Sequence, residues 1–170
     1  MASSISGMVG ESLFEQRIRS DRTSLETLAT RIAPLLAQSD AQALQAQLLA
    51  AGGELGGRVL LLDQNGKVQM DSYGEMQGVR LQYPEIANIL VKGQNADYGV
   101  HELDSGAELD PSHLLFTRRT AAAWVGYCTA GVVYASDIIG VLLLVSPVQE
   151  IMQNMYQLQD QMILIFLDNM

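Results

Sequence analysis

The chain has 170 residues, enough for one domain with a sizeable core, and its 48% hydrophobic and 17% charged residues are typical of a globular protein. The net charge is −9, and the ten Lys and Arg residues form no basic stripe, which argues against nucleic-acid binding. Cys128 is the single cysteine, so an internal disulfide is excluded; inside an apolar run it is expected to be a buried small side chain.

The two ends of the chain give weaker indications. Residues 1–10 lack the features of a secretory signal and are expected to be flexible or artificially appended. No segment reaches the ~20 apolar residues of a membrane span. The apolar stretch 162–167 has two interpretations, since it suits either the buried end of a helix or the start of a membrane helix within 162–170.

The first third of the chain predicts two helices. Over about 11–37, apolar residues alternate by three and four, apart from Asp21, in a narrow stripe that suits a coiled coil or a long helix lying on a sheet. Pro34 predicts a kink or an early end near 31–33. A second helix, capped by Ser39 or Asp40, is predicted to run to about Ala51 and to end at Gly52-Gly53. Its inward residues are expected to be Leu44, Leu48 and Leu49.

A β-hairpin is the next element. Strand-forming residues at about 58–63 and 67–72 flank Asp63-Gln64-Asn65-Gly66, and Asn-Gly is a strong hairpin signal because both residues tolerate positive φ. Residues 72–83 have loop character, with glycines as breakers. Pro84 then predicts the first turn of a short helix that runs to about Val91 and stops at Gly93.

Three further strands and a final helix are predicted. Residues 98–103 indicate one strand, 104–111 the most mobile loop, and 112–123 are ambiguous. Two long strands at about 124–134 and 138–146 follow, and the apolar run 141–145 is typical of a strand buried on both faces. From Pro147 onward the pattern predicts a heptad helix, whose repeating apolar residues are Val148, Ile151, Met155, Leu158, Met162 and Ile165.

This order of elements predicts an α+β fold. About five strands in mostly antiparallel pairing, with the helices packed on one face, is the economical arrangement. Histidines occur only at positions 101 and 113, with no metal-binding spacing, and the glycine-rich segment 52–57 lacks the Lys of a phosphate loop. No nucleophile elbow is present. Catalysis by this chain, a cofactor and a metal are therefore not expected.

Five segments in order resemble a known family. They are Leu61-Leu-Asp-Gln-Asn-Gly-Lys-Val-Gln-Met-Asp-Ser72, Gly78-Val-Arg-Leu81, Pro84-Glu-Ile86, Tyr98-Gly-Val-His101 and Ile139-Gly-Val-Leu-Leu-Leu-Val-Ser-Pro-Val148. Together they resemble the extracytoplasmic PAS-like sensor domain of Cache type that membrane-bound bacterial sensor histidine kinases carry. The resemblance covers about 11–166 as a single domain.

The resemblance implies a function for the chain within a larger protein. It implies a signal-sensing domain of a two-component sensor histidine kinase, located outside the cell membrane and anchored to it in the full-length protein, with a long N-terminal helix and a C-terminal output helix. The kinase activity would lie outside these residues. Alternatives are the same module on a chemoreceptor or a cyclic-nucleotide cyclase, and, from another class, a cytoplasmic scaffold of roadblock or longin type.

The resemblance also implies where a ligand would bind. Such domains hold small molecules of varied identity, or none, in a cavity between the sheet and the loops after the hairpin. Residues expected near that cavity are Arg80, Tyr98, His101, Arg118, Arg119, Trp124 and Tyr127. Arg118 or Arg119 could hold a carboxylate, but neighbouring strand residues face opposite ways, so at most one points inward. Core or surface packing of Trp124 and Tyr127 remains the other interpretation.

The terminal heptad helix has two interpretations as well. Its apolar seam could pack on the sheet, or it could pair with its twin in a homodimer and relay the signal. The second is favoured, because the seam extends beyond what a five-stranded sheet covers. The residues expected to form the pairing surface are Met155, Leu158, Met162 and Ile165.

Overall fold

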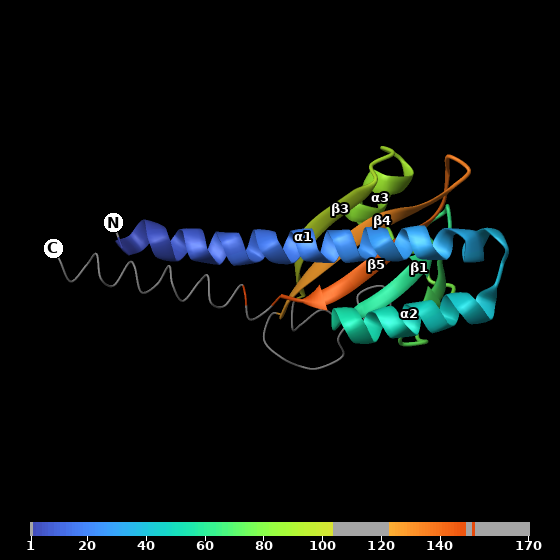
Figure 1. Cartoon of the computed structure of the whole chain (residues 1–170), viewed down its shortest axis with the longest axis horizontal. Helices are drawn as coiled ribbons and strands as arrows, with labels where there is room; N and C mark the ends of the chain where they lie inside the picture. Colours follow the sequence, from blue (N-terminus) through green and yellow to red (C-terminus); the bar gives the residue numbers. More distant parts are fainter. Residues whose placement is uncertain (1, 104–122, 149–150, 152–170) are drawn as a thin grey trace.

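The computed structural model describes residues 2–103, 123–148 and 151. Five strands form one antiparallel sheet in the order β2-β1-β5-β4-β3, as Figure 1 shows. The strands are β1 (Arg58–Leu62), β2 (Val68–Asp71), β3 (Ala96–Leu103), β4 (Ala123–Tyr134) and β5 (Asp137–Pro147). The predicted five-stranded α+β fold is confirmed, and the strand bounds agree with prediction to within one or two residues.

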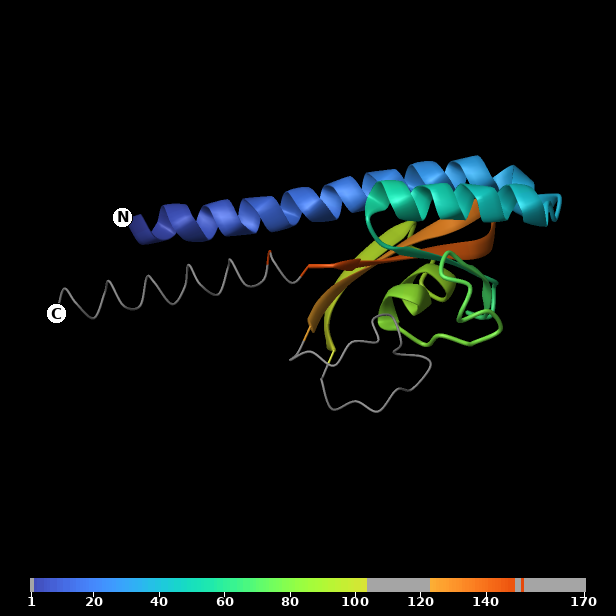
Figure 2. The ribbon, with the colours of Figure 1, turned by 90° about the horizontal axis from the view of Figure 1, so that it is seen from below.

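Helices cover both faces of this sheet. The long helix α1 (Ala2–Ala37) and the antiparallel helix α2 (Ala41–Leu55) lie together on one face, whereas α3 (Pro84–Leu90) lies on the other (Figure 2). The prediction that the helices share one face is therefore wrong for α3. The reason is local: Ile86 and Ile89 stand one helical turn apart, and their burial requires the apolar face that α1 and α2 leave uncovered.

Two hydrophobic cores follow from this layering. Alternate residues of the central strands face opposite ways, so each strand contributes to both cores. The α1 face buries Leu25, Leu28 and Ile32 of α1 and Leu44 and Leu48 of α2 against strand residues that include Cys128. The α3 face buries the hairpin and loop residues Val68, Met76 and Leu81 with Ile86 and Ile89. The run 141–145 of β5 is fully buried, as predicted for a strand covered on both sides.

Pro34 does not end α1 early, because the helix continues to Ala37. Proline has no N–H to donate to the carbonyl of Thr30, four residues earlier. Pro34 and Thr30 are both exposed, so water can hydrogen-bond this carbonyl instead. The helix ends where Ser39 takes a φ of 55°, and the amide of Asp40 donates to the Leu35 carbonyl, as in a Schellman ending.

The second helix runs further than predicted. Asp40 is its N-cap, accepting from the Ala43 amide at 3.2 Å, but Gly52 and Gly53 lie inside the helix and Gly56 ends it with a φ of 62°. The prediction of an end at Gly52-Gly53 is wrong: these two glycines do not take positive φ, and the left-handed residue that ends the helix is Gly56. Leu49, predicted to be inward, is 52% exposed.

The two tight turns of the sheet differ in how many of their residues adopt positive φ. In the β1–β2 turn only Gly66 has positive φ (80°), and the Asp63 carboxylate accepts from the amides of Asn65 and Lys67. The turn with two consecutive positive φ values is instead the β4–β5 turn, at Ala135 (50°) and Ser136 (70°). Left-handed backbone at non-glycine residues is strained, so the longer β4–β5 pairing holds this turn in place.

A buried ion pair ties the hairpin to the loop that follows it. The Arg58 and Asp71 side chains are both fully buried, and Arg58 donates to the Asp71 carboxylate through Nη2 and through Nε at 2.8 Å. Asp71 also accepts from the backbone amides of Tyr73, Glu75 and Met76. Burial alone would raise the pKa of Asp71, but the hydrogen bonds from Arg58 and these amides hold it below its ordinary value.

Several predictions fall outside the described residues: the loop 104–111, most of 112–123, and the heptad helix beyond Ile151. Pro147, expected to open that helix, is the last residue of β5. Within the described residues, no helix combines the length and apolar character that crossing a bilayer requires.

Candidate functional site

The sequence-predicted ligand residues divide between the two faces of the sheet. In β3 and β4 the pairs Tyr98 with Cys128 and His101 with Val125 lie opposite each other. Because side chains alternate, Tyr98 and Trp124 face α1, whereas His101 and Tyr127 face α3. Arg80 is exposed and donates to the Asn65 carbonyl. Arg118 and Arg119 lie outside the described residues, so the structure brings together only His101 and Tyr127.

Glu85 completes a polar cluster on the α3 face. Pro84 starts α3, and the next residue, Glu85, points onto the sheet with only 6% of its surface exposed. Its Oε1 lies 2.7 Å from Nε2 of His101. A methyl group at Gly99 would collide with this carboxylate, so a glycine in the strand makes the space that Glu85 occupies. Thr129 fixes the start of the helix by donating to the Glu85 carbonyl at 2.9 Å.

The imidazole of His101, which contacts this carboxylate, packs against two tyrosine rings. Tyr83, His101 and Tyr127 contact one another, with ring centroids 4.3 Å apart for His101 and Tyr127 and 4.7 Å for Tyr83 and Tyr127. Tyr127 pairs with Gly99 in the sheet, which places it beside the Glu85 carboxylate. Burial raises the pKa of the Tyr127 hydroxyl, and the neighbouring Tyr83 and the charge of Glu85 raise it further.

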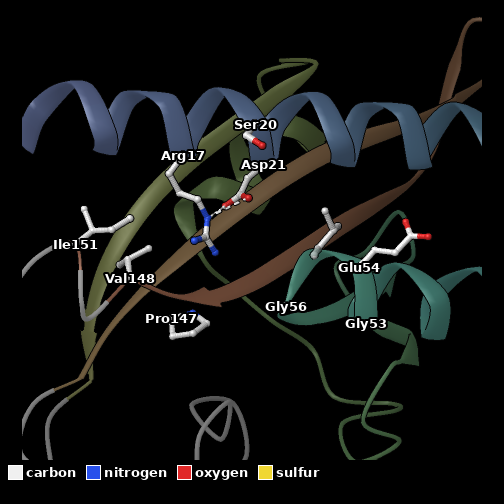
Figure 3. A pocket seen from close by; sticks show the side chains of 10 residues that line it. Arg17, Ser20, Asp21, Gly53, Glu54, Gly56, Pro147, Val148 and Ile151 are labelled. Atoms are coloured by element: carbon white, nitrogen blue, oxygen red, sulfur yellow. Dashed lines mark hydrogen bonds and ion pairs between the residues drawn. The ribbon is translucent and has the colours of Figure 1, made fainter. Parts of the chain in front are cut away.

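A second polar group lies on the α1 face, at the end of β5. Arg17 and Asp21 form an ion pair along α1 at 3.2 Å, and Ser146 of β5 donates to Asp21 at 3.5 Å. Beside them is a cavity of about 850 Å³ between α1, the end of α2 and the end of β5 (Figure 3). Arg17 and Asp21 reach into it from α1, and Pro147 and Val148 bound it below.

Burial governs the electrostatics of this second group. Burial raises the pKa of Asp21, and the charge and hydrogen bond of Arg17 only partly oppose this. The Tyr98 hydroxyl is buried against Gly126 without a hydrogen-bond partner among the described residues. Burial and the nearby Asp21 charge raise the pKa of this hydroxyl.

Two further observations concern the nucleophile and the metal ligands that the described residues supply. Burial raises the pKa of the Cys128 thiol to about 12, so little nucleophilic thiolate forms near neutral pH. In the part of the chain that the structure describes, no group of three His, Cys, Asp or Glu side chains could hold a metal ion. Sequence reasoning identified His101 and Tyr127 but missed Glu85 and Tyr83. The signal available for them was Pro84, which predicted a helix start directly beside both.

The order and arrangement of the strands and helices define the fold. A five-stranded antiparallel sheet, preceded by a long helix and carrying a short helix on its other face, is the PAS-like fold of Cache-type sensor domains, as the resemblance implied. The structure is similar to the crystal structure of the V. cholerae histidine kinase DctB sensor domain, with a TM-score of 0.51 and 16% sequence identity. No protein-family model and no curated protein sequence matches the chain.

The extent of the similarity is unequal in the two proteins. The match covers 87% of this chain but 57% of the DctB sensor domain. This chain therefore corresponds to little more than half of the domain to which it is similar. At 16% identity the likeness establishes the fold, whereas the activity of the whole protein is a separate question.

Proposed function

We propose that residues 11–166 form the extracytoplasmic signal-sensing domain of a membrane-bound two-component sensor histidine kinase. The domain itself is not catalytic: it binds a small molecule on the α3 face and passes the change to its terminal helices. His101 and Tyr127 belong to the ligand site, whereas Tyr98 and Trp124, on the opposite face, position α1. In the full-length protein the domain is anchored to the membrane and is a homodimer.

The observation that carries this proposal is the relation between α1 and β5. α1 extends past the sheet at the end where β5 finishes (Figure 1). At that end Ser146 of β5 donates to Asp21 of α1 across the core. A displacement of the sheet is therefore transmitted to α1 close to the point where the chain leaves β5. This arrangement suits a relay that biases two positions of the terminal helices.

The alternatives differ in what surrounds this domain. A chemoreceptor or a cyclic-nucleotide cyclase would carry the same module with another output. The roadblock or longin alternative is disfavoured by the likeness to a histidine kinase sensor domain and by the 36-residue length of α1. The coding sequence on both sides of these residues separates them, because the proposal requires membrane-spanning segments and a kinase core with a phosphoacceptor histidine.

The functional test is autophosphorylation of the full-length protein in membrane vesicles. We expect transfer of phosphate from ATP to a histidine, and we expect Ser146→Ala to change its rate because the link to Asp21 is lost. Ser20→Ala is the matched control: Ser20 lines the same cavity but is exposed on α1. Absence of phosphotransfer in the intact protein, or equal effects of the two variants, would contradict the relay.

Dimerisation has its own test. Light scattering on residues 1–170 is expected to show concentration-dependent association that charged substitutions at Met155 and Met162 weaken. A strict monomer at millimolar concentration would contradict pairing through the terminal helix.

A further inference from the structure

The buried carboxylate of Glu85 has one oxygen without a partner. Oε1 is engaged by His101 at 2.7 Å, whereas Oε2 is buried and accepts no hydrogen bond from the described residues. An unsatisfied carboxylate oxygen that is removed from water is destabilising, so such groups are usually paired. Gly99 makes the space that holds the carboxylate there, which means that this position is built into the fold.

The surroundings of Oε2 fit a cation. The rings of Tyr83 and Tyr127, with centroids 4.7 Å apart, pack beside His101, and the faces of tyrosine rings attract a positive charge. The carboxylate itself repels an anion, and the chain's net charge of −9 adds a weaker long-range attraction for cations. The His101 side chain is 29% exposed against 8% for Glu85, so the cluster opens to solvent along the imidazole.

The number of available oxygens selects the type of cation. A guanidinium group binds a carboxylate best through both oxygens, and the contact of His101 with Oε1 takes one of the acceptor sites that such a bidentate pair would use. A quaternary ammonium group has no N–H to donate to Oε2. A primary ammonium group can donate one hydrogen bond to Oε2 and present its remaining charge to the rings. A bare metal ion would find one carboxylate and one imidazole here, fewer ligands than such ions require.

We propose that Glu85, with the Tyr83, His101 and Tyr127 rings, binds the primary ammonium group of a small organic amine. This inference rests on the proposed sensing function, for which it names the ligand class. The amine donates to Oε2 of Glu85, and its first methylene groups pack against the rings.

The test uses residues 1–170 and four probes of matched chain length: butylammonium, butyltrimethylammonium, butylguanidinium and pentanoate. Titration is followed by NMR of the tyrosine and histidine ring protons. We expect butylammonium to shift the rings of Tyr83 and Tyr127, to give intermolecular contacts to them, and to bind roughly tenfold or more tightly than butyltrimethylammonium. Tighter binding of pentanoate, or ring contacts with none of the probes, would overturn the proposal.

Variants identify the acceptor. Glu85→Gln is expected to lower butylammonium affinity at least about tenfold, since a hydrogen bond to a charged acceptor is lost. Glu102→Gln is the matched control because Glu102 is exposed on β3 and faces away from α3. Equal affinities in the two variants would assign the site elsewhere. If Glu85→Gln fails to fold, the ring contacts in the unaltered chain decide the matter.

The two proposals fail separately. If the full-length protein phosphorylates itself and responds to stimuli while butylammonium makes no ring contacts, only the amine site is wrong. If butylammonium binds through Glu85 but the full-length protein has no kinase output, the site stands and the proposed function is wrong.

Discussion

Replacing Asp71 by alanine should be among the most damaging single substitutions in the described structure. The change leaves the Arg58 guanidinium, which is fully buried, without its main counter-charge, and it removes the acceptor of three backbone amides in the loop after β2. Breaking a buried ion pair by removing one partner costs about 3–5 kcal/mol. Arg58 retains Tyr73, 4.7 Å below its guanidinium carbon, and Glu75 at 3.7 Å, so we expect about 3–4 kcal/mol.

Asp63→Ala is the matched control for this prediction. Asp63 also accepts from two backbone amides in a turn, but among the described residues it forms no ion pair with a buried cation. Its loss should cost about 1 kcal/mol. Urea unfolding followed by circular dichroism measures both, and with a slope of roughly 2 kcal/mol/M the Asp71→Ala midpoint should fall by about 1.5–2 M. A midpoint for Asp71→Ala within about 0.5 M of the control would refute the reasoning.

The pH dependence provides an independent check of the same ion pair. The folded-state pKa of Asp71 is lowered, so its contribution is complete above the ordinary value of about 3.9 and is lost as the pH falls through the lower folded value. The stability advantage of the unaltered chain over Asp71→Ala should therefore be constant near neutral pH and shrink below about pH 4. An advantage that stays constant down to pH 2 would mean that the charge of Asp71 is not what stabilises the loop.

Three further predictions concern single positions. Burial raises the pKa of Asp21, so the folded chain loses stability as the pH rises above the ordinary pKa of an aspartate and this buried carboxyl ionises. Asp21→Asn should therefore gain stability relative to the unaltered chain between pH 4 and pH 7 in urea titrations, and a relative loss would contradict this. Gly99→Ala should cost about 1–3 kcal/mol in the same assay by displacing Glu85, whereas Gly53→Ala, which meets no atom, should be neutral or stabilising, and equal costs would contradict the close approach. Ser136→Gly should raise stability by about 0.5–1 kcal/mol because it relieves a φ of 70°, and a lower melting temperature would argue against strain there.

The sequence predicted the elements well because their signals are local. The conformation can be predicted from a few neighbouring residues in the strand runs, at Pro84 in the first turn of a helix, and in the apolar run 141–145. What failed was conformation fixed by distant contacts. Two consecutive positive φ values were predicted at Asn65-Gly66, but Ala135 and Ser136 adopt them instead, because the β4–β5 pairing imposes this turn. Asp21 interrupts the apolar stripe of α1, and the side chain that donates a hydrogen bond to it, Ser146, comes 125 residues later in the chain.

The candidate site was predictable only in part for the same reason. His101 and Tyr127 were chosen as polar and aromatic residues on expected strands, and the pairing of β3 with β4 brings them together. Glu85 carried no signal of its own, because a glutamate in the first turn of a helix is usually exposed and favourable there. Only the placement of α3 on the face opposite α1 turns it inward, and that face could not be assigned from periodicity in a seven-residue helix.

The two polar groups on opposite faces meet the sheet at neighbouring positions. Gly99 receives the Glu85 carboxylate from the α3 side, and Gly126 receives the Tyr98 hydroxyl from the α1 side. Gly99 pairs with Tyr127 and its neighbour Val100 pairs with Gly126, so the two contacts lie in adjacent pairs of the β3–β4 ladder. Neither glycine has a side chain to absorb a displacement. Under the proposed sensing function, a ligand that shifts Glu85 would press on the same stretch of backbone against which Tyr98 packs, and Tyr98 lies near Asp21 in the middle of α1.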